Sequence, residues 1–145
     1  MEARSSKKGS LENIITVKKE DTWTALFADD HASQLSITAS FVISNANGST
    51  CHAVAYFYDK DGIALKIDTE NEYRAADGTL SSAVSFIPTS DNMDYVSSPL
   101  KIYLPYSVIP VPAGTVNLQY DLEIFDNKWN LVEKSGLQPF SFNLQ

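Results

Sequence analysis

Two aspartates on either side of a lysine, followed by a glycine, form the most suggestive ligand pattern in the sequence. Asp59 and Asp61 stand two residues apart before Gly62, as the first ligands of a calcium loop do. A helix–loop–helix calcium site needs a further oxygen ligand and a later glutamate, where this sequence has Ile63 and Thr69. The same pattern is typical of a turn in which aspartate accepts backbone N–H groups. We favour the turn and keep a calcium site at Asp59 and Asp61 as the alternative.

Nucleophilic or acid–base catalysis has few candidate residues. Cys51 and His52 are adjacent, but neighbours on a strand point to opposite faces, so they do not form a thiol–imidazole pair. His31 follows two aspartates, yet the sequence has no Gly-x-Ser-x-Gly nucleophile motif to accompany it. Two histidines cannot make a three-histidine zinc site. The sequence therefore predicts a protein that is not an enzyme and that uses no cofactor, calcium being the one alternative.

Other acidic and aromatic residues could also bind a ligand. Carboxylates at every second position of one stretch predict a solvated acidic face, formed by Asp68, Glu70 and Glu72. On a strand, Tyr56 and Tyr58 share one face and Phe57 takes the other. Three tyrosines beside turns could line a shallow platform, although cross-strand packing is the interpretation that we favour for them: Tyr73, Tyr95 and Tyr106.

Alternation of apolar and polar residues predicts the strands that must position these groups. The clearest runs are residues 35–43 and 116–124, where apolar residues recur at every second position. Shorter runs, bounded by Gly, Pro, Asn and Asp, are expected at 51–58, 63–67, around Tyr73, and at 80–87, 100–104, 131–134 and 140–144. Residues 88–99 are expected to be a connection, and only residues 21–31 have a pattern that a helix could adopt.

Short strands separated by turn residues predict an all-β fold. We expect an antiparallel two-sheet β-sandwich, immunoglobulin-like or C2-like, of about eight strands, with a closed barrel as the alternative. A chain of 145 residues is long enough for one domain. Residues 1–12 are rich in Ser, Gly and Lys and are expected to be a disordered N-terminal lead. The single β-sandwich domain is then expected over residues 13–145.

Composition and charge argue against several classes of partner. Eighteen acidic and eleven basic residues give a net charge of −7, which argues against nucleic acid as a partner. Residues 1–20 hold five basic and three acidic residues (+2), whereas residues 21–145 hold six and fifteen (−9). The apolar runs are far shorter than the roughly 20 residues of a membrane helix, and no signal peptide is recognisable. We therefore expect a cytoplasmic protein that does not bind membranes.

Five short phrases follow one another between residues 55 and 126. They are AYFYDKDG at 55–62, ADG at 76–78, FIP at 86–88, LPY at 104–106 and LQYDLEIFD at 118–126. Together they resemble an uncharacterised bacterial β-sandwich accessory module found in multi-domain proteins. The resemblance covers roughly residues 35–142. It implies a sandwich appended to other machinery, and it brings no catalytic or binding residue with it.

An interaction module is the function that these observations favour. Prolines on both sides of residues 100–104 indicate an edge strand, and an exposed edge invites strand addition by another protein. We therefore predict that a protein partner contacts the edge residues Leu100, Ile102, Tyr103 and Tyr106. The alternative function is a calcium- or carbohydrate-binding module that uses the Asp59/Asp61 turn and nearby tyrosines.

Overall fold

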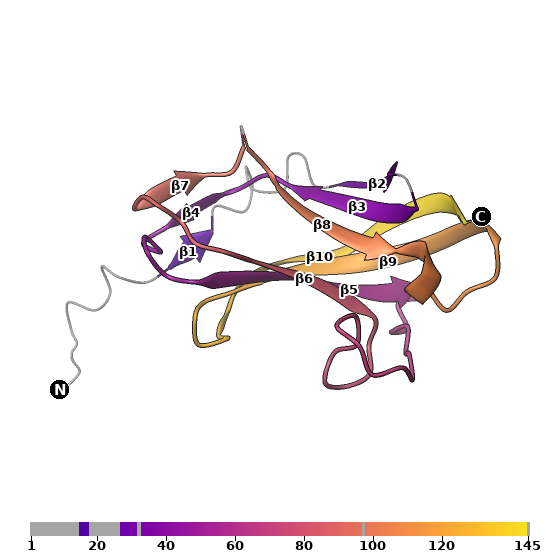
Figure 1. Ribbon diagram of the computed structural model, residues 1–145. Helices are drawn as coiled ribbons and strands as arrows, with labels where there is room; N and C mark the ends of the chain where they lie inside the picture. Colours follow the sequence, from indigo (N-terminus) through magenta and orange to yellow (C-terminus); the bar gives the residue numbers. More distant parts are fainter. Residues whose placement is uncertain (1–14, 18–26, 32, 97, 145) are drawn as a thin grey trace.

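The described part of the chain forms two packed layers of β-strands (Figure 1). The computed structural model describes residues 15–17, 27–31, 33–96 and 98–144. No helix among these residues is long and apolar enough to cross a membrane. In chain order, the elements are β1 (Thr16–Val17), β2 (Phe27–His31), β3 (Gln34–Ala39), β4 (Val42–Ser44), β5 (Cys51–Asp59), β6 (Ser81–Phe86), β7 (Asn92–Asp94), β8 (Leu100–Pro105), the 3-10 turn η2 (Tyr106–Val108), β9 (Gly114–Phe125) and β10 (Leu131–Leu144).

One layer is a four-stranded antiparallel sheet in the order β10–β9–β5–β6. Its central pair is β5 and β9, which are in register from the pair His52 and Phe125 to the pair Asp59 and Leu118. Alternate residues of each strand point into the sandwich, and the inward side chains of β9 from Val116 to Ile124 are all buried. This layer forms the lower half of the molecule in Figure 1.

The other layer is a sheet that breaks in the middle. Strands β2–β3–β8 form one part and β1–β4–β7 the other, again antiparallel. Only Ser40 and Phe41 separate β3 from β4, and the Tyr95 N–H bridges the break by donating to the Phe41 carbonyl at 2.7 Å. The expected antiparallel two-sheet sandwich is confirmed.

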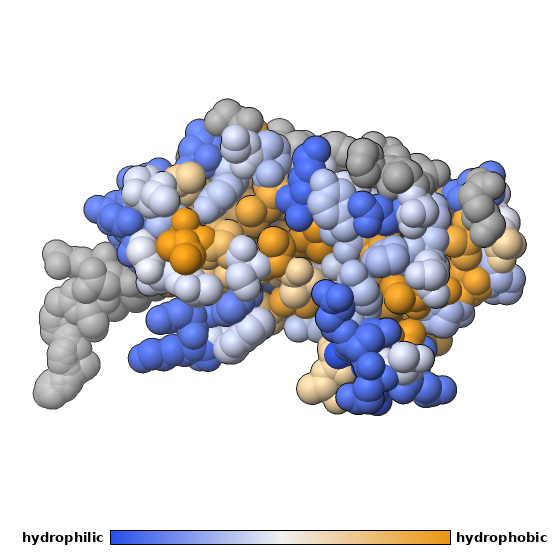
Figure 2. Space-filling view, in the orientation of Figure 1, coloured by the Kyte–Doolittle hydropathy of each residue, from blue (hydrophilic) through white to orange (hydrophobic). Residues whose placement is uncertain are grey.

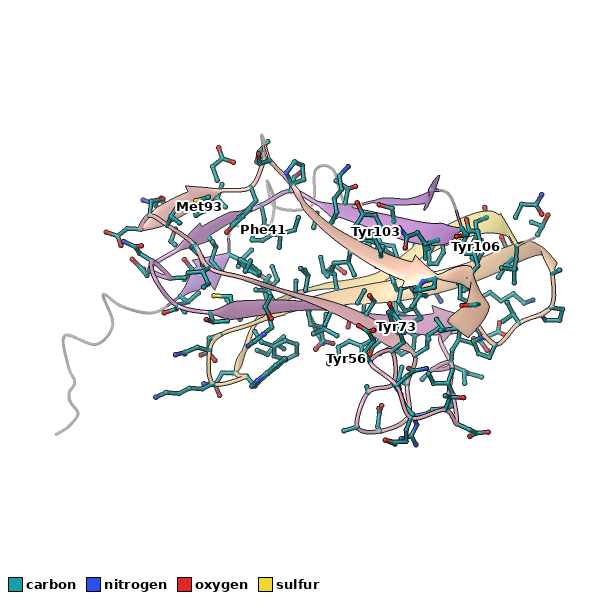
Figure 3. All side chains as sticks on the ribbon, viewed as in Figure 1. Phe41, Tyr56, Tyr73, Met93, Tyr103 and Tyr106 are labelled. Carbon is teal, nitrogen blue, oxygen red and sulfur yellow. The ribbon has the colours of Figure 1, made fainter. Side chains whose placement is uncertain are left out.

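Aromatic side chains fill both ends of the space between the layers. Phe41 contacts Phe86 and Tyr95 at one end, with ring centroids 5.8 and 5.0 Å apart. At the other end, Tyr106 stacks on Phe142 at 5.3 Å, and neighbouring rings continue this contact along β10 and β9. Figure 3 shows Phe41 and Tyr106 at these opposite ends. Burial of rings from both sheets holds the layers together.

Several expected elements differ in extent from those observed. The run 35–43 is divided into β3 and β4, and the runs 131–134 and 140–144 are parts of the single strand β10. Residues 63–67 make only the isolated bridges of Ala64 and Lys66, and β7 lies in what was expected to be a connection. The helical alternative for 21–31 is wrong for Phe27–His31, which pairs with β3 as a strand. The expected lead, 1–12, lies outside the described residues.

Replacing Phe41 tests the packing at the break in the second layer. The side chain is 0% exposed and contacts rings from both layers, so Phe41→Ala should lower the free energy of unfolding by about 3–5 kcal/mol. Ile87→Ala, at an exposed position, is the control and should stay within about 0.5 kcal/mol. Urea unfolding of both variants measures the difference. A loss below about 1 kcal/mol for Phe41→Ala would contradict this account of the core.

Candidate functional site

The outer surface of the four-stranded sheet carries the main concentration of chemically active side chains. The pairing of β5 with β9 places Tyr56 directly opposite Asp121, and Val54 opposite Glu123. The pairing of β10 with β9 adds Lys134 beside Glu123 and Leu137 beside Asp121. Since residues directly opposite each other project from the same side of a sheet, these side chains share one surface. We call this surface the outer face; its residues are Val54, Tyr56, Tyr58, Asp121, Glu123, Lys134 and Leu137.

A bulge in β10 holds the first carboxylate of the outer face in place. The register between β9 and β10 shifts between Lys134 and Leu137, where Gly136 has a φ of +75°. The Gly136 N–H donates to Asp121 Oδ1 at 3.0 Å, and the Leu122 N–H donates to Ser135 Oγ, also at 3.0 Å. Glycine is suited to this positive φ because it has no Cβ. Asp121 is therefore fixed in a largely buried position, with 8% of its surface exposed.

The second carboxylate, Glu123, lies two residues along β9 and retains its proton more strongly than usual. Partial burial, a hydrogen bond with Asp121 and the charge of Asp121 together raise the pKa of Glu123 to about 7, and Lys134 opposes this shift. Burial and the charge of these carboxylates also raise the pKa values of the Tyr56 and Tyr58 hydroxyls. The outer face is thus a cluster of interacting groups rather than a set of independent, solvated side chains.

Two projections border the outer face. One is the turn between β9 and β10, where Asp126 Oδ1 accepts the N–H groups of Lys128 and Asn130, both at 2.9 Å. These hydrogen bonds help to lower the pKa of Asp126. The turn presents Trp129, which is 56% exposed, has a φ of +64°, and stacks on His52 with centroids 3.8 Å apart. The turn therefore adds an aromatic wall beside the sheet.

The second projection is the segment 60–80 between β5 and β6. Lys66 Nζ donates to the Asp77 carbonyl at 3.0 Å, and Arg74 Nε donates to the Ile67 carbonyl at 2.9 Å. Figure 1 shows this segment and the β9–β10 turn extending from the same side of the sandwich. Figure 2 shows the surface recessed between them, and Figure 3 shows Tyr56 on that side. The outer face is the floor of this recess.

The predicted edge residues lie on β8 and η2, but most of them face inward. Strand β8 is at the edge of the sheet β2–β3–β8. Leu100 packs against the core and Ile102 is buried, so a substitution of Ile102 would disturb the core. Tyr103 is 39% exposed, and its carbonyl accepts the Ser82 hydroxyl of the other layer at 2.5 Å. Tyr106 stacks on Phe142. A role for these residues in partner binding stays a prediction.

The Asp59–Gly62 segment has the hydrogen bonds of a turn. Asp59 Oδ1 accepts the N–H groups of Asp61 at 2.8 Å and Ile63 at 3.0 Å. Gly62 has a φ of +81°, which closes the turn. Within the described part of the chain, no three His, Cys, Asp or Glu side chains are grouped to hold a metal ion. The geometry favours the turn. Calcium binding by Asp59 and Asp61 stays the alternative prediction, which a titration with calcium can test.

The other candidate groups do not converge. Cys51 is buried, and this burial raises the pKa of its thiol, whereas His52 points to the outer side and contacts Trp129. Asp68, Glu70 and Glu72 are exposed, as expected, but they lie in a loop and Glu70 pairs with Arg74. The tyrosine platform is not formed, because Tyr95 packs against Phe41, far from Tyr106 (Figure 3). His31 lies at the end of β2, paired with Gln34.

Sequence reasoning placed Tyr56 and Tyr58 on one face but did not join them to Asp121 and Glu123. The sequence signal is the polar side of the run 116–124, where two carboxylates alternate with apolar residues. The cross-strand register brings that polar side next to the tyrosines, and no pattern within one strand specifies the register.

The chain resembles a solved structure, although at low similarity. No family model and no curated protein matches the chain. The chain is similar to a bacterial adhesin from Mobiluncus mulieris that contains intramolecular disulfide, isopeptide and ester bond cross-links. The two are 11% identical with a TM-score of 0.45, and the match covers 90% of this chain and 57% of the adhesin chain. This similarity is too low to support a functional conclusion, so the function is argued from the chain's own residues.

Two substitutions of Asp59 distinguish the turn from a metal site. Asp59→Asn keeps an oxygen acceptor for both N–H groups and should leave the free energy of unfolding within a few tenths of a kcal/mol. Asp59→Ala removes the acceptor and should cost about 1 kcal/mol. Thermal melting with and without millimolar calcium is the measurement. A site filled at 100 times its dissociation constant would add ~2.7 kcal/mol, and a calcium shift that Asp59→Asn abolishes would overturn the turn interpretation.

The carboxyl pair predicts a specific pH dependence of stability. The pKa of Glu123 is raised from 4.5 to about 7, so the folded protein binds more protons than the unfolded chain between these values. The contribution of Glu123 to the free energy of unfolding is therefore fully present below pH 4.5 and is lost as the pH rises through 7. Glu123→Gln removes this loss, so the variant should gain about 1–2 kcal/mol on the wild type between pH 5.5 and 8, allowing for solvent screening.

Urea unfolding at several pH values tests this expectation, with Glu72→Gln as the control because Glu72 is an exposed carboxylate of the loop. The control should follow the wild type at every pH. If Glu123→Gln also follows the wild type, Glu123 does not retain its proton in the folded state.

Proposed function

We propose that this domain is a non-catalytic module that binds a protein partner through the outer face. The observation that carries the proposal is the arrangement of the outer face. Two partly buried tyrosines and two hydrogen-bonded carboxyl groups lie together in a recess on the sheet. A solvent-exposed sheet face needs only polar side chains, whereas this one combines aromatic, aliphatic and carboxyl groups. Aromatic residues near a recessed centre are typical of protein-binding surfaces.

The carboxyl pair itself does not support an enzymatic function. Glycosidases hold their two carboxyl groups about 5–9.5 Å apart so that the sugar or a water molecule fits between them. Asp121 and Glu123 instead interact directly with each other, since a hydrogen bond with Asp121 and the charge of Asp121 contribute to the raised pKa of Glu123. The thiol of Cys51 is also buried inside the sandwich, on the opposite face of β5 from the carboxyl pair. Binding is the function that this geometry supports better.

The sheet edges support strand addition less well than the outer face supports docking. Strand β8 approaches the other layer through the hydrogen bond from Ser82 to Tyr103. Strand β10 contains Pro139, which has no N–H to donate, and the bulge at Gly136 interrupts its ladder. Proline, bulges and covered edges are the devices by which proteins prevent edge pairing. The edge prediction for Leu100, Ile102, Tyr103 and Tyr106 is therefore our second proposal for the docking surface.

Site-specific photo-cross-linking separates the two docking surfaces. A photoreactive phenylalanine analogue, p-benzoylphenylalanine, is introduced at Tyr58 on the outer face, at Tyr103 on β8, or at the exposed control position Ala113. In cells that produce the protein, we expect a discrete adduct from position 58 only. Excess wild-type domain should compete for the adduct, and a Tyr56→Ala domain should not.

The other outcomes are equally informative. A competed adduct from position 103 alone would move docking to the β8 edge. Adducts of equal strength at all three positions would show non-specific contact and would overturn the proposed function.

A further inference from the structure

We infer that the outer face recognises a cationic side chain, lysine or arginine, of its protein partner. This inference rests on the proposed function and specifies the chemistry of the partner. It is carried by the juxtaposition of Asp121 and Glu123 on β9 with Tyr56 and Tyr58 on β5, on the floor of the recess.

The geometry matches the requirements for binding a cation. Asp121 and Glu123 lie two residues apart on the same side of β9, and Tyr56 is directly opposite Asp121 on the neighbouring strand. An ammonium or guanidinium group that enters here finds carboxylate acceptors for charge-assisted hydrogen bonds. Tyrosine rings at the border of such a site also attract cations through their π-systems. Val54 and Leu137 offer apolar surface for the methylene stem of a lysine or arginine.

The negative charge of the site has little compensation within the domain. Lys134 on β10 lies directly opposite Glu123 on β9, but its side chain is exposed. Among the described residues, no ion pair within 4.0 Å joins Lys134 to Asp121 or Glu123. The Gly136 N–H is the backbone donor that stabilises Asp121. Residues 21–145 as a whole carry six basic and fifteen acidic residues. Charge complementarity therefore favours a basic partner.

Two other ligand classes fit the site less well. A neutral saccharide would pack against aromatic rings, but it carries no positive charge that could neutralise the carboxyl pair. A free divalent cation prefers six or more oxygen ligands, and the described residues offer no third acidic side chain here. A cationic side chain satisfies both carboxyl groups and also uses the apolar surface beside them.

Cation binding and proton binding at the outer face exclude each other. Glu123 retains its proton near neutral pH, so an incoming cation must displace that proton. Binding should therefore strengthen as the pH rises from 6 to 8, by about tenfold for a group that titrates near pH 7. The titratable and charged groups that act on Glu123 or on the adjacent tyrosines are Asp121 on β9, Tyr56 and Tyr58 on β5, Lys134 on β10 and Asp77 in the segment 60–80.

The test is an NMR titration of the purified ¹⁵N-labelled chain with four blocked tripeptides. Each has the form acetyl-Gly-X-Gly-amide, where X is lysine, arginine, norleucine or glutamate. We expect the lysine and arginine peptides to shift the amide signals of β9 around Asp121–Glu123 and of β5 around Tyr56. Norleucine has the apolar stem without the charge, and it should bind at least tenfold more weakly. The dissociation constant of the lysine peptide should fall about tenfold from pH 6 to pH 8.

Matched variants assign the effect to the carboxyl pair. Asp121→Asn and Glu123→Gln keep the shape of the side chains and should each weaken lysine-peptide binding at least tenfold at pH 8. Glu72→Gln removes an exposed carboxylate from the loop and should leave the affinity unchanged. The spectrum of each variant without peptide shows whether it is folded, and Glu123→Gln is expected to be at least as stable as the wild type at that pH.

Three results would overturn the inference. The first is equal binding of the norleucine and lysine peptides, and the second is binding of lysine that Glu123→Gln does not change. The third is the absence of peptide shifts together with shifts of the same residues by a neutral oligosaccharide such as maltotriose or cellotriose, which would make the outer face a carbohydrate site. If no probe binds while cross-linking at position 58 succeeds, the cationic chemistry is wrong and the proposed function still holds.

Discussion

The register between β5 and β9 is the constraint on which both the core and the outer face depend. In this register Phe57 and Tyr120 point into the sandwich together, while Tyr56 and Asp121 point out together. A shift by one residue would reverse the facing of one strand and would place Asp121 and Glu123 against the aromatic core. Burying two carboxylates among rings costs far more than any cross-strand contact returns, so the alternation of β9 selects one register. The same selection that builds the core therefore assembles the outer face.

Most of the central strands could be predicted because their residues alternate. The runs 51–58, 100–104 and 116–124 correspond closely to β5, β8 and β9. The sequence did not predict the break between β3 and β4, because Phe41 and Ile43 continue the apolar alternation of β3 through it. The sequence pattern also predicted two separate strands where β10 is continuous. The reason is that the bulge at Gly136 shifts the alternation of apolar residues by one position. Strand β7 has only three residues, too few for a periodic pattern, and pairing with β4 defines it.

The candidate site could be predicted only in parts. A strand pattern is enough to place Tyr56 with Tyr58, and Asp121 with Glu123, on common faces. Their meeting depends on which strands are neighbours and in what register, and both are properties of the tertiary structure. The most tempting local motif, Asp59 to Gly62, uses its carboxylate for backbone hydrogen bonds instead. Short motifs of this kind report local chain conformation, whereas the outer face is built from residues more than sixty positions apart in the sequence.

The proton held at Glu123 links stability to the binding that we propose. A glutamine at this position would remove the raised pKa and its destabilising effect above pH 7, and it would fit the same strand. Residues that lower stability in this way are found mainly where a protein contacts a ligand, because folding alone gives no reason to keep them. The bulge at Gly136 adds to this argument, since it interrupts the β9–β10 ladder and directs an N–H to Asp121. Two local departures from the most stable sheet thus converge on one carboxyl pair, which is where we propose that a cationic side chain binds.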